Sequence, residues 1–117
     1  MPLPDQDHNM ALGAAADLTR RHRNRMISNL GVAGLVDGCL GGVFSKAAIQ
    51  RLLQQPGCTH LRFYYGEDAQ GGRHVVLVGT DSEGDDIVGT SAVVLQNHLL
   101  CPPVCPVTTT STVLRNG

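Results

Sequence analysis

The sequence has no tryptophan and few other aromatic residues: two phenylalanines and two tyrosines among 117 residues. These are Phe44, Phe63, Tyr64 and Tyr65. The core must therefore be built mainly from leucine, valine, isoleucine and alanine around them. A chain of this length can bury a sufficient hydrophobic core by itself, so we expect any metal ion or disulfide to be dispensable for folding.

The sequence also lacks an excess of either charge, with nine Lys and Arg against ten Asp and Glu, a net charge of −1. No field of the whole molecule draws it to nucleic acid or to an anionic membrane. The most apolar stretch, residues 30–44, contains Asp37 and is shorter than the ~20 residues of a membrane span. The first ten residues show no basic region followed by an apolar one, which predicts a cytoplasmic protein with no membrane partner.

Motifs of common enzyme classes are missing as well. GCLGGVFSK, residues 38–46, lacks the Gly-Lys-Ser/Thr order of a phosphate-binding loop, so a tight turn is favoured over a phosphate site there. Ser45 and Ser91 lack the Gly-x-Ser-x-Gly context of a hydrolase. The acidic run Asp81–Asp86 is shorter than a calcium-binding loop and is typical of a turn. We predict no catalytic residues and no resident cofactor, and a non-enzymatic role is favoured.

Two helices are expected in the first half. The first covers about residues 9–28, where Ala11, Ala15, Leu18, His22 and Met26 share one stripe. The glycine-punctuated stretch 30–42 then indicates a loop. Ser45 precedes a second helix, which Pro56 and Gly57 should end.

Three β segments follow: residues 58–65, 74–81 and 87–95, separated by glycine-rich or acidic turns. This order predicts an α+β fold, with two N-terminal helices packed on a small antiparallel sheet, a β-meander. The expected organisation is a flexible N-terminus at 1–8, a single α+β domain at 9–100, and an extended tail rich in proline and cysteine at 101–117.

The segment 41–105 carries a recurring set of motifs. They are a Gly-Gly-x-Phe-Ser-Lys helix start, an Arg-Phe-Tyr-Tyr-Gly strand, a Leu-Val-Gly-x-Asp hairpin and a Cys-Pro-Pro-x-Cys close. The set resembles a family of small uncharacterised bacterial proteins. No activity is established for that family, so the resemblance implies a shared fold and transfers no functional residue.

Three soft ligands lie within eight positions: His98, Cys101 and Cys105. Thiolate and imidazole are the ligands that Zn²⁺ prefers, and a fourth ligand would come from Cys39, Cys58, His60, His74 or a second subunit. Without an export signal the cysteines should be mostly reduced. However, the prolines favour an extended path that keeps Cys101 and Cys105 apart unless the chain turns at Pro103 and Val104. A zinc site, a redox dithiol and a rigid tail all remain open.

Arg20, Arg21, Arg23 and Arg25 form a basic cluster on the first helix. Arginines neutralise phosphates, so the cluster is a candidate for interaction with nucleic acid. The four scatter around the helix, no aromatic residues are interleaved, and a solvated surface or a subunit contact is favoured instead. His22, in the apolar stripe, is expected to be partly buried and hydrogen-bonded.

Self-association is the favoured function. The apolar strands HVVLVG (74–79) and AVVL (92–95) should leave sheet edges that need covering, and a second copy covers an edge economically. We therefore predict a homo-oligomeric structural or interaction module. The alternatives are a metal- or thiol-dependent protein using residues 101–105, and nucleic-acid binding through the first helix.

Overall fold

The structure is a computed structural model of the chain and describes residues 2–30, 41–96, 99–101 and 114. The chain divides into two compact units, one made of residues 1–6 and 44–97 and the other of residues 7–43 and 98–117. Within the described residues, no helix is long and apolar enough to cross a membrane. The predicted segments 1–8, 9–100 and 101–117 stay a prediction.

A three-stranded antiparallel sheet forms the first unit. Its strands are β2 (His60–Glu67), β3 (Arg73–Thr80) and β4 (Val94–Gln96), in the order β2-β3-β4. β2 and β3 are the predicted hairpin, joined by a turn in which the Asp68 amide donates to the Gly72 carbonyl at 2.9 Å. Gly71 has a positive φ of 84°, which glycine adopts without strain. The α+β fold class with its antiparallel meander is confirmed.

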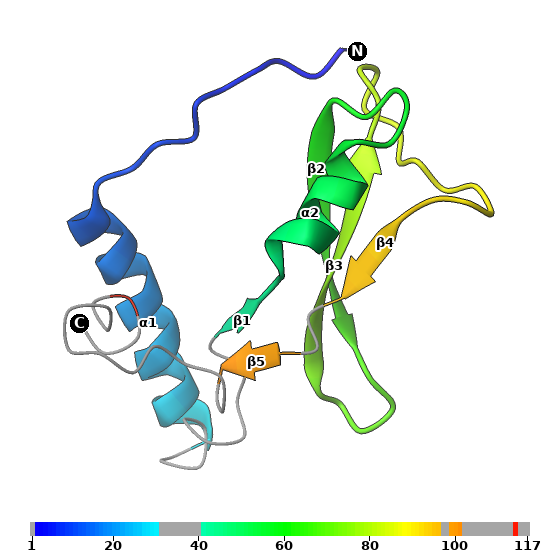
Figure 1. The fold of residues 1–117 in the computed structure, drawn as a ribbon. Helices are drawn as coiled ribbons and strands as arrows, with labels where there is room; N and C mark the ends of the chain where they lie inside the picture. The colour runs from blue at the N-terminus through cyan, green and yellow to red at the C-terminus, as the bar shows by residue number, and fades with distance from the viewer. Residues whose placement is uncertain (1, 31–40, 97–98, 102–113, 115–117) are drawn as a thin grey trace. The chain divides into compact units, whose positions relative to one another are not determined.

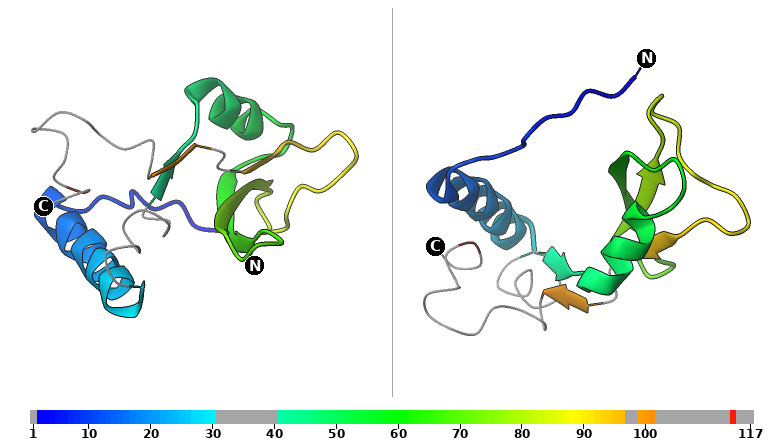
Figure 2. Two further views of the ribbon diagram at one scale, coloured as in Figure 1. Left: turned by 90° about the horizontal axis from the view of Figure 1, so that it is seen from below. Right: turned by 45° about the horizontal axis from the view of Figure 1, so that its top comes forward.

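Helix α2 (Lys46–Leu53) packs against this sheet and contacts all three of its strands (Figures 1 and 2). Ser45 precedes it with an extended backbone, as predicted for a cap, although its side chain makes no capping hydrogen bond. After the helix, Gly57 has a φ of 80° and the chain turns towards β2. The helix faces the sheet with Leu52, which is fully buried, and the sheet adds Leu77 and Val78 to the core.

The second unit contains α1 (Leu12–Leu30), close to the predicted 9–28. Ala16 is its buried residue, and His22 and Met26 are half-buried. The predicted apolar stripe is wrong at Leu18, which is 55% exposed. The buried side is rotated away from Leu18 and centres on Ala16.

The same unit holds a two-stranded sheet that the sequence did not predict. β1 (Gly41–Val43) pairs antiparallel with β5 (Leu99–Cys101), and Gly41 lies opposite Cys101. The expectation of a loop is therefore wrong for Gly41 and Gly42, and the tail begins after a paired strand. The rest of the glycine-rich stretch, residues 31–40, and most of the tail lie outside the described residues.

Candidate functional site

Strand β2 lies at an edge of its sheet, so one side of its backbone has no neighbouring strand among the described residues. Antiparallel partners alternate between hydrogen-bonded and non-hydrogen-bonded pairs. The hydrogen bond from the Asp68 amide to the Gly72 carbonyl shows that Asp68 and Gly72 are a hydrogen-bonded pair, and this determines which residues of β2 bond to β3. The even-numbered residues of β2 therefore bond to β3, and the odd-numbered ones, from Leu61 to Glu67, direct their amides and carbonyls outward.

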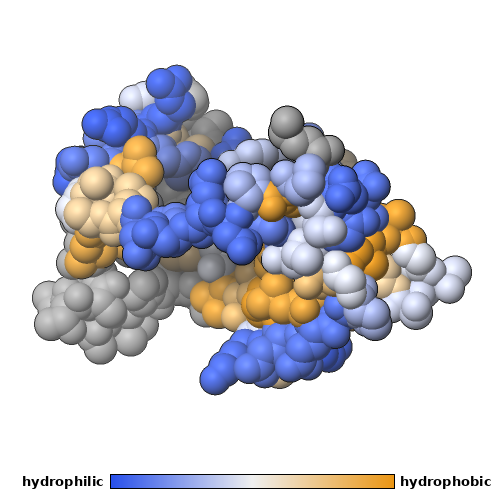
Figure 3. Space-filling model, turned by 90° about the horizontal axis from the view of Figure 1, so that it is seen from above, coloured by the Kyte–Doolittle hydropathy of each residue, from blue (hydrophilic) through white to orange (hydrophobic). Residues whose placement is uncertain are grey.

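Three of these odd-numbered residues expose apolar side chains on one face of the sheet. Phe63 is 55% exposed, Tyr65 is 75% exposed, and Leu61 is exposed as well. The Phe63 and Tyr65 rings meet edge to face, with centroids 5.6 Å apart and planes at 81°. We call the outward backbone and these three side chains the β2 edge. Hydrophobic side chains are also exposed on the face drawn in Figure 3.

The opposite face of β2 carries a polar cluster. Arg62 Nη1 donates to Asp86 Oδ1 at 2.6 Å, and the Tyr64 hydroxyl donates to the other oxygen of the same carboxylate. Tyr64 and then Asp86 raise the pKa of Arg62 above its ordinary value. Because each group already has a partner, the cluster acts as a brace between β2 and the chain after β3.

A second polar pair lies at the tip of the hairpin. His74 Nε2 lies 3.0 Å from Asp68 Oδ2, and the Gln70 and Gly72 amides donate to Asp68 Oδ1. The bond to His74, followed by that from Gly72, lowers the pKa of Asp68. His74 Nδ1 is buried without a hydrogen-bond partner among the described residues. The carboxylate of Asp68 therefore stabilises the turn through these three contacts.

The predicted metal ligands are only partly described. Cys101 is 7% exposed and forms a disulfide, so the expectation of reduced cysteines is wrong at this position. His98 and Cys105 lie outside the described residues. Zinc binds thiolates, so a site using Cys101 would first require reduction.

Three of the proposed sources of a fourth ligand, Cys58, His60 and His74, have other partners, and the remaining one, Cys39, lies outside the described residues. Cys58 is a free thiol whose sulfur donates to the His60 carbonyl at 3.3 Å. His60 Nε2 lies 3.1 Å from the Pro4 carbonyl, and His74 is engaged with Asp68. No three of His, Cys, Asp or Glu gather in a metal-binding arrangement among residues 2–30, 41–96, 99–101 and 114. The zinc site of His98, Cys101 and Cys105 stays a prediction.

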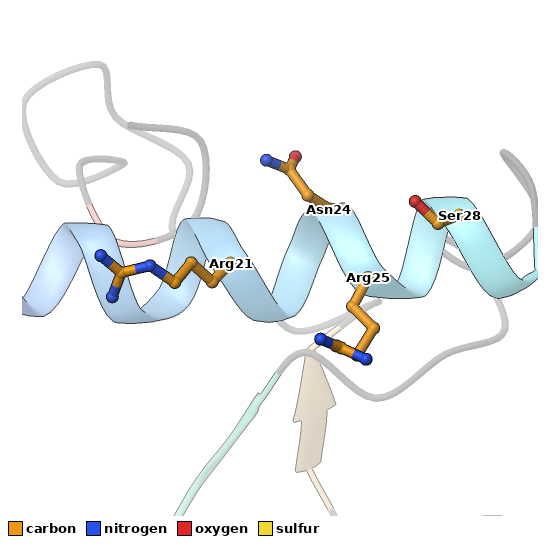
Figure 4. Close-up of a pocket in the computed structure, with 4 residues that line it drawn as sticks. All are labelled: Arg21, Asn24, Arg25 and Ser28. Carbon is orange, nitrogen blue, oxygen red and sulfur yellow. The ribbon is translucent and has the colours of Figure 1, made fainter.

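The four arginines of α1 separate into two pairs. Arg20 bonds Asp17 at 2.8 Å, and Arg23 donates to the Leu114 carbonyl at 3.5 Å. Arg21 and Arg25 instead line an open hollow of about 440 Å³ together with Asn24 and Ser28 (Figure 4). The predicted cluster is therefore not one site, and only half of it remains available to a ligand.

The β2 edge was missed by sequence reasoning, which placed the open edges at residues 74–79 and 92–95. Residues 74–79 belong to β3, which is the central strand and leaves no open edge, whereas β4 is an edge strand. The available signal was the position of Leu61, Phe63 and Tyr65 at every second residue of the strand. Their period of two places three apolar side chains on one face.

Comparisons with known proteins found no matching family model, no matching curated protein and no matching solved structure. The resemblance carried by residues 41–105 stays a prediction.

Proposed function

We propose that the chain is a small non-enzymatic module that associates with a second copy of itself, and that the β2 edge is the surface through which the copies pair. The observation that carries the proposal is the coincidence of outward backbone groups with the exposed side chains of Leu61, Phe63 and Tyr65. An open edge strand is a template for another strand. Lysine and proline, which protect edge strands from pairing with another chain, are absent from the outward positions 61, 63 and 65.

The strand alternation restricts how two copies can pair. Hydrogen-bonded partners must both be odd-numbered, because only those residues direct their backbone groups outward. A symmetric antiparallel pairing that uses the whole odd series places Phe63 opposite Tyr65 of the second copy, and Tyr65 opposite Phe63. Aromatic pairs directly opposite each other contribute roughly 0.2–1 kcal/mol each. Tyr64 then faces Tyr64 of the second copy on the other side, and the two sheets become one of six strands.

Light scattering coupled to size-exclusion chromatography tests this proposal. We expect the wild type to be a dimer or larger at micromolar concentration. The variant Phe63→Lys/Tyr65→Lys should be monomeric, because it places charges on the pairing face while leaving the bonds of β2 to β3 in place. Circular dichroism checks that the variant is folded.

Val88→Lys is the matched control, since Val88 is 71% exposed and lies outside the β2 edge. It should associate as the wild type does. A wild type that stays monomeric at the highest soluble concentration rejects the proposal. Association that survives in Phe63→Lys/Tyr65→Lys rejects the β2 edge as its surface.

We propose further that the protein works in the cytoplasm. As a second candidate function we propose thiol–disulfide chemistry, which the disulfide at Cys101 favours. Cytosolic disulfides are usually transient and redox-linked. Trapping thiols in intact cells with an alkylating reagent tests both statements. We expect Cys101 to be alkylated in untreated cells and protected after brief oxidant treatment. Protection in both states would exclude a transient disulfide and favour an oxidising compartment.

A further inference from the structure

Two arginines one turn apart on α1 have no partner of opposite charge in the part of the chain that the structure describes. Arg21 and Arg25 are exposed, and neither makes an ion pair or hydrogen bond to the described residues. Like charges at positions i and i+4 repel each other and destabilise a helix. Arg20, in contrast, has its carboxylate partner in Asp17. The surface around Arg21 and Arg25 therefore holds two positive charges that nothing described in the chain offsets.

Polar donors complete this surface. Asn24 and Ser28 continue the same helix face at spacings of three and seven residues from Arg21, and no carboxylate is among the described residues that line the hollow. In Figure 4 all four side chains come from α1; Arg21 lies along the helix, and Arg25 extends away from it. The hollow is wide enough at about 440 Å³ to admit a small polar group. Guanidinium, amide and hydroxyl groups all donate hydrogen bonds to oxyanions.

We propose that this hollow binds a phosphate group, with Arg21 and Arg25 as its charged contacts and Asn24 and Ser28 as additional donors. The charge argues for phosphate, because a phosphate monoester carries about −1.5 to −2 at pH 7 and so matches two guanidinium groups. A carboxylate would offset only one of them. The site lies in the unit of α1, outside the unit of the β2 edge, so it goes beyond the proposed self-association and does not depend on it.

Nuclear magnetic resonance titration of the full chain with inorganic phosphate tests the site. We expect shifts of the amide signals of residues 21–28 and saturable binding. The variant Arg21→Gln/Arg25→Gln should weaken binding at least tenfold while circular dichroism shows that α1 is retained. Arg51→Gln/Arg73→Gln loses the same charge from exposed positions of the other unit and should bind as the wild type does.

A fluorescent single-stranded oligonucleotide distinguishes the source of the phosphate. If both arginines contact its backbone, the slope of log K against log salt should be about −1.4, a loss of about sevenfold between 50 and 200 mM salt. Oligonucleotide binding that is lost in Arg21→Gln/Arg25→Gln assigns the site to a phosphodiester chain. Binding of inorganic phosphate alone assigns it to a small phosphate-bearing ligand. Binding of neither probe at low salt, or unchanged binding in that variant, overturns the proposal.

Discussion

Leu52 and Leu53 are adjacent on α2 and chemically identical, yet Leu52 is fully buried and Leu53 is 45% exposed. Leu52→Ala should lower the free energy of unfolding by about 2–5 kcal/mol, because it removes buried methyl groups and leaves a cavity. Leu53→Ala is the matched control and should cost less than about 1 kcal/mol. Urea unfolding followed by circular dichroism measures both. Equal losses would contradict the assignment of Leu52 to the core.

Asp68 supplies a pH-dependent contribution to stability. The bonds from His74 and the Gly72 amide lower its pKa in the folded chain below the ordinary 3.8. A carboxyl with a lowered folded pKa stabilises the protein above its unfolded pKa, and that stabilisation is lost as the pH falls through the folded pKa. Asp68→Asn should therefore destabilise the protein at neutral pH.

The difference between wild type and Asp68→Asn should shrink as the pH falls below the ordinary pKa of 3.8 and through the lower folded pKa of Asp68. Urea midpoints at a series of pH values measure it. A difference that stays constant across this range would show that the hairpin tip does not depend on the ionised carboxylate.

Gly13 in α1 and Gly57 in the turn after α2 should respond oppositely to the same substitution. Gly57, after α2, has a φ of 80° that an alanine adopts only with strain, although space is open around it. Gly57→Ala should cost about 1–2 kcal/mol. Gly13, in the first turn of α1, has a helical backbone and nothing within 4 Å of an added Cβ. Gly13→Ala should stabilise by about 0.5 kcal/mol, and thermal unfolding of both variants checks the signs.

The elements that the sequence predicted are those with strong local signals. α2 has a serine before it and Pro56-Gly57 after it, and the hairpin has apolar runs around a glycine-rich turn. The pair β1 and β5 escaped prediction because its partners are distant: Gly41 and Cys101 are sixty residues apart, and neither strand exceeds three residues. Glycine at 41 and 42 indicated a loop locally, and only the distant strand supplies the pairing that overrides it.

The candidate sites could likewise be predicted from the sequence only where local patterns determine them, and not where they depend on contacts between distant residues. The sequence identified the arginines of α1 as a group but not which of them remain available, because Arg23 is engaged by Leu114, 91 residues away. It also indicated self-association through a sheet edge, but the edge depends on strand order, which residue patterns do not specify. Leu61, Phe63 and Tyr65 could be identified as one face, and only the order β2-β3-β4 places that face on an outer strand.

At the scale of the whole molecule, the disulfide of Cys101 links the chain's stability to its redox environment. Cys101 is bonded, whereas Cys58 is a free thiol. Cys101→Ser should lower the free energy of unfolding by about 2–4 kcal/mol, because a cross-link restricts the unfolded chain. Cys58→Ser is the control and should leave the response to reductant unchanged. Urea unfolding with and without reductant measures both variants.

Alkylation of the denatured, unreduced protein gives an independent readout of the same bond. Peptide mapping should find Cys58 labelled at once and Cys101 labelled only after reduction, and the peptide released with Cys101 identifies its partner as Cys39 or Cys105. The two partners have different consequences. By chain entropy, a bond to Cys39 would close a loop of about 60 residues and contribute about 4 kcal/mol, whereas a bond to Cys105 would close about five residues and contribute about 2 kcal/mol. Labelling of Cys101 before reduction would contradict the disulfide and restore its thiolate as a possible zinc ligand.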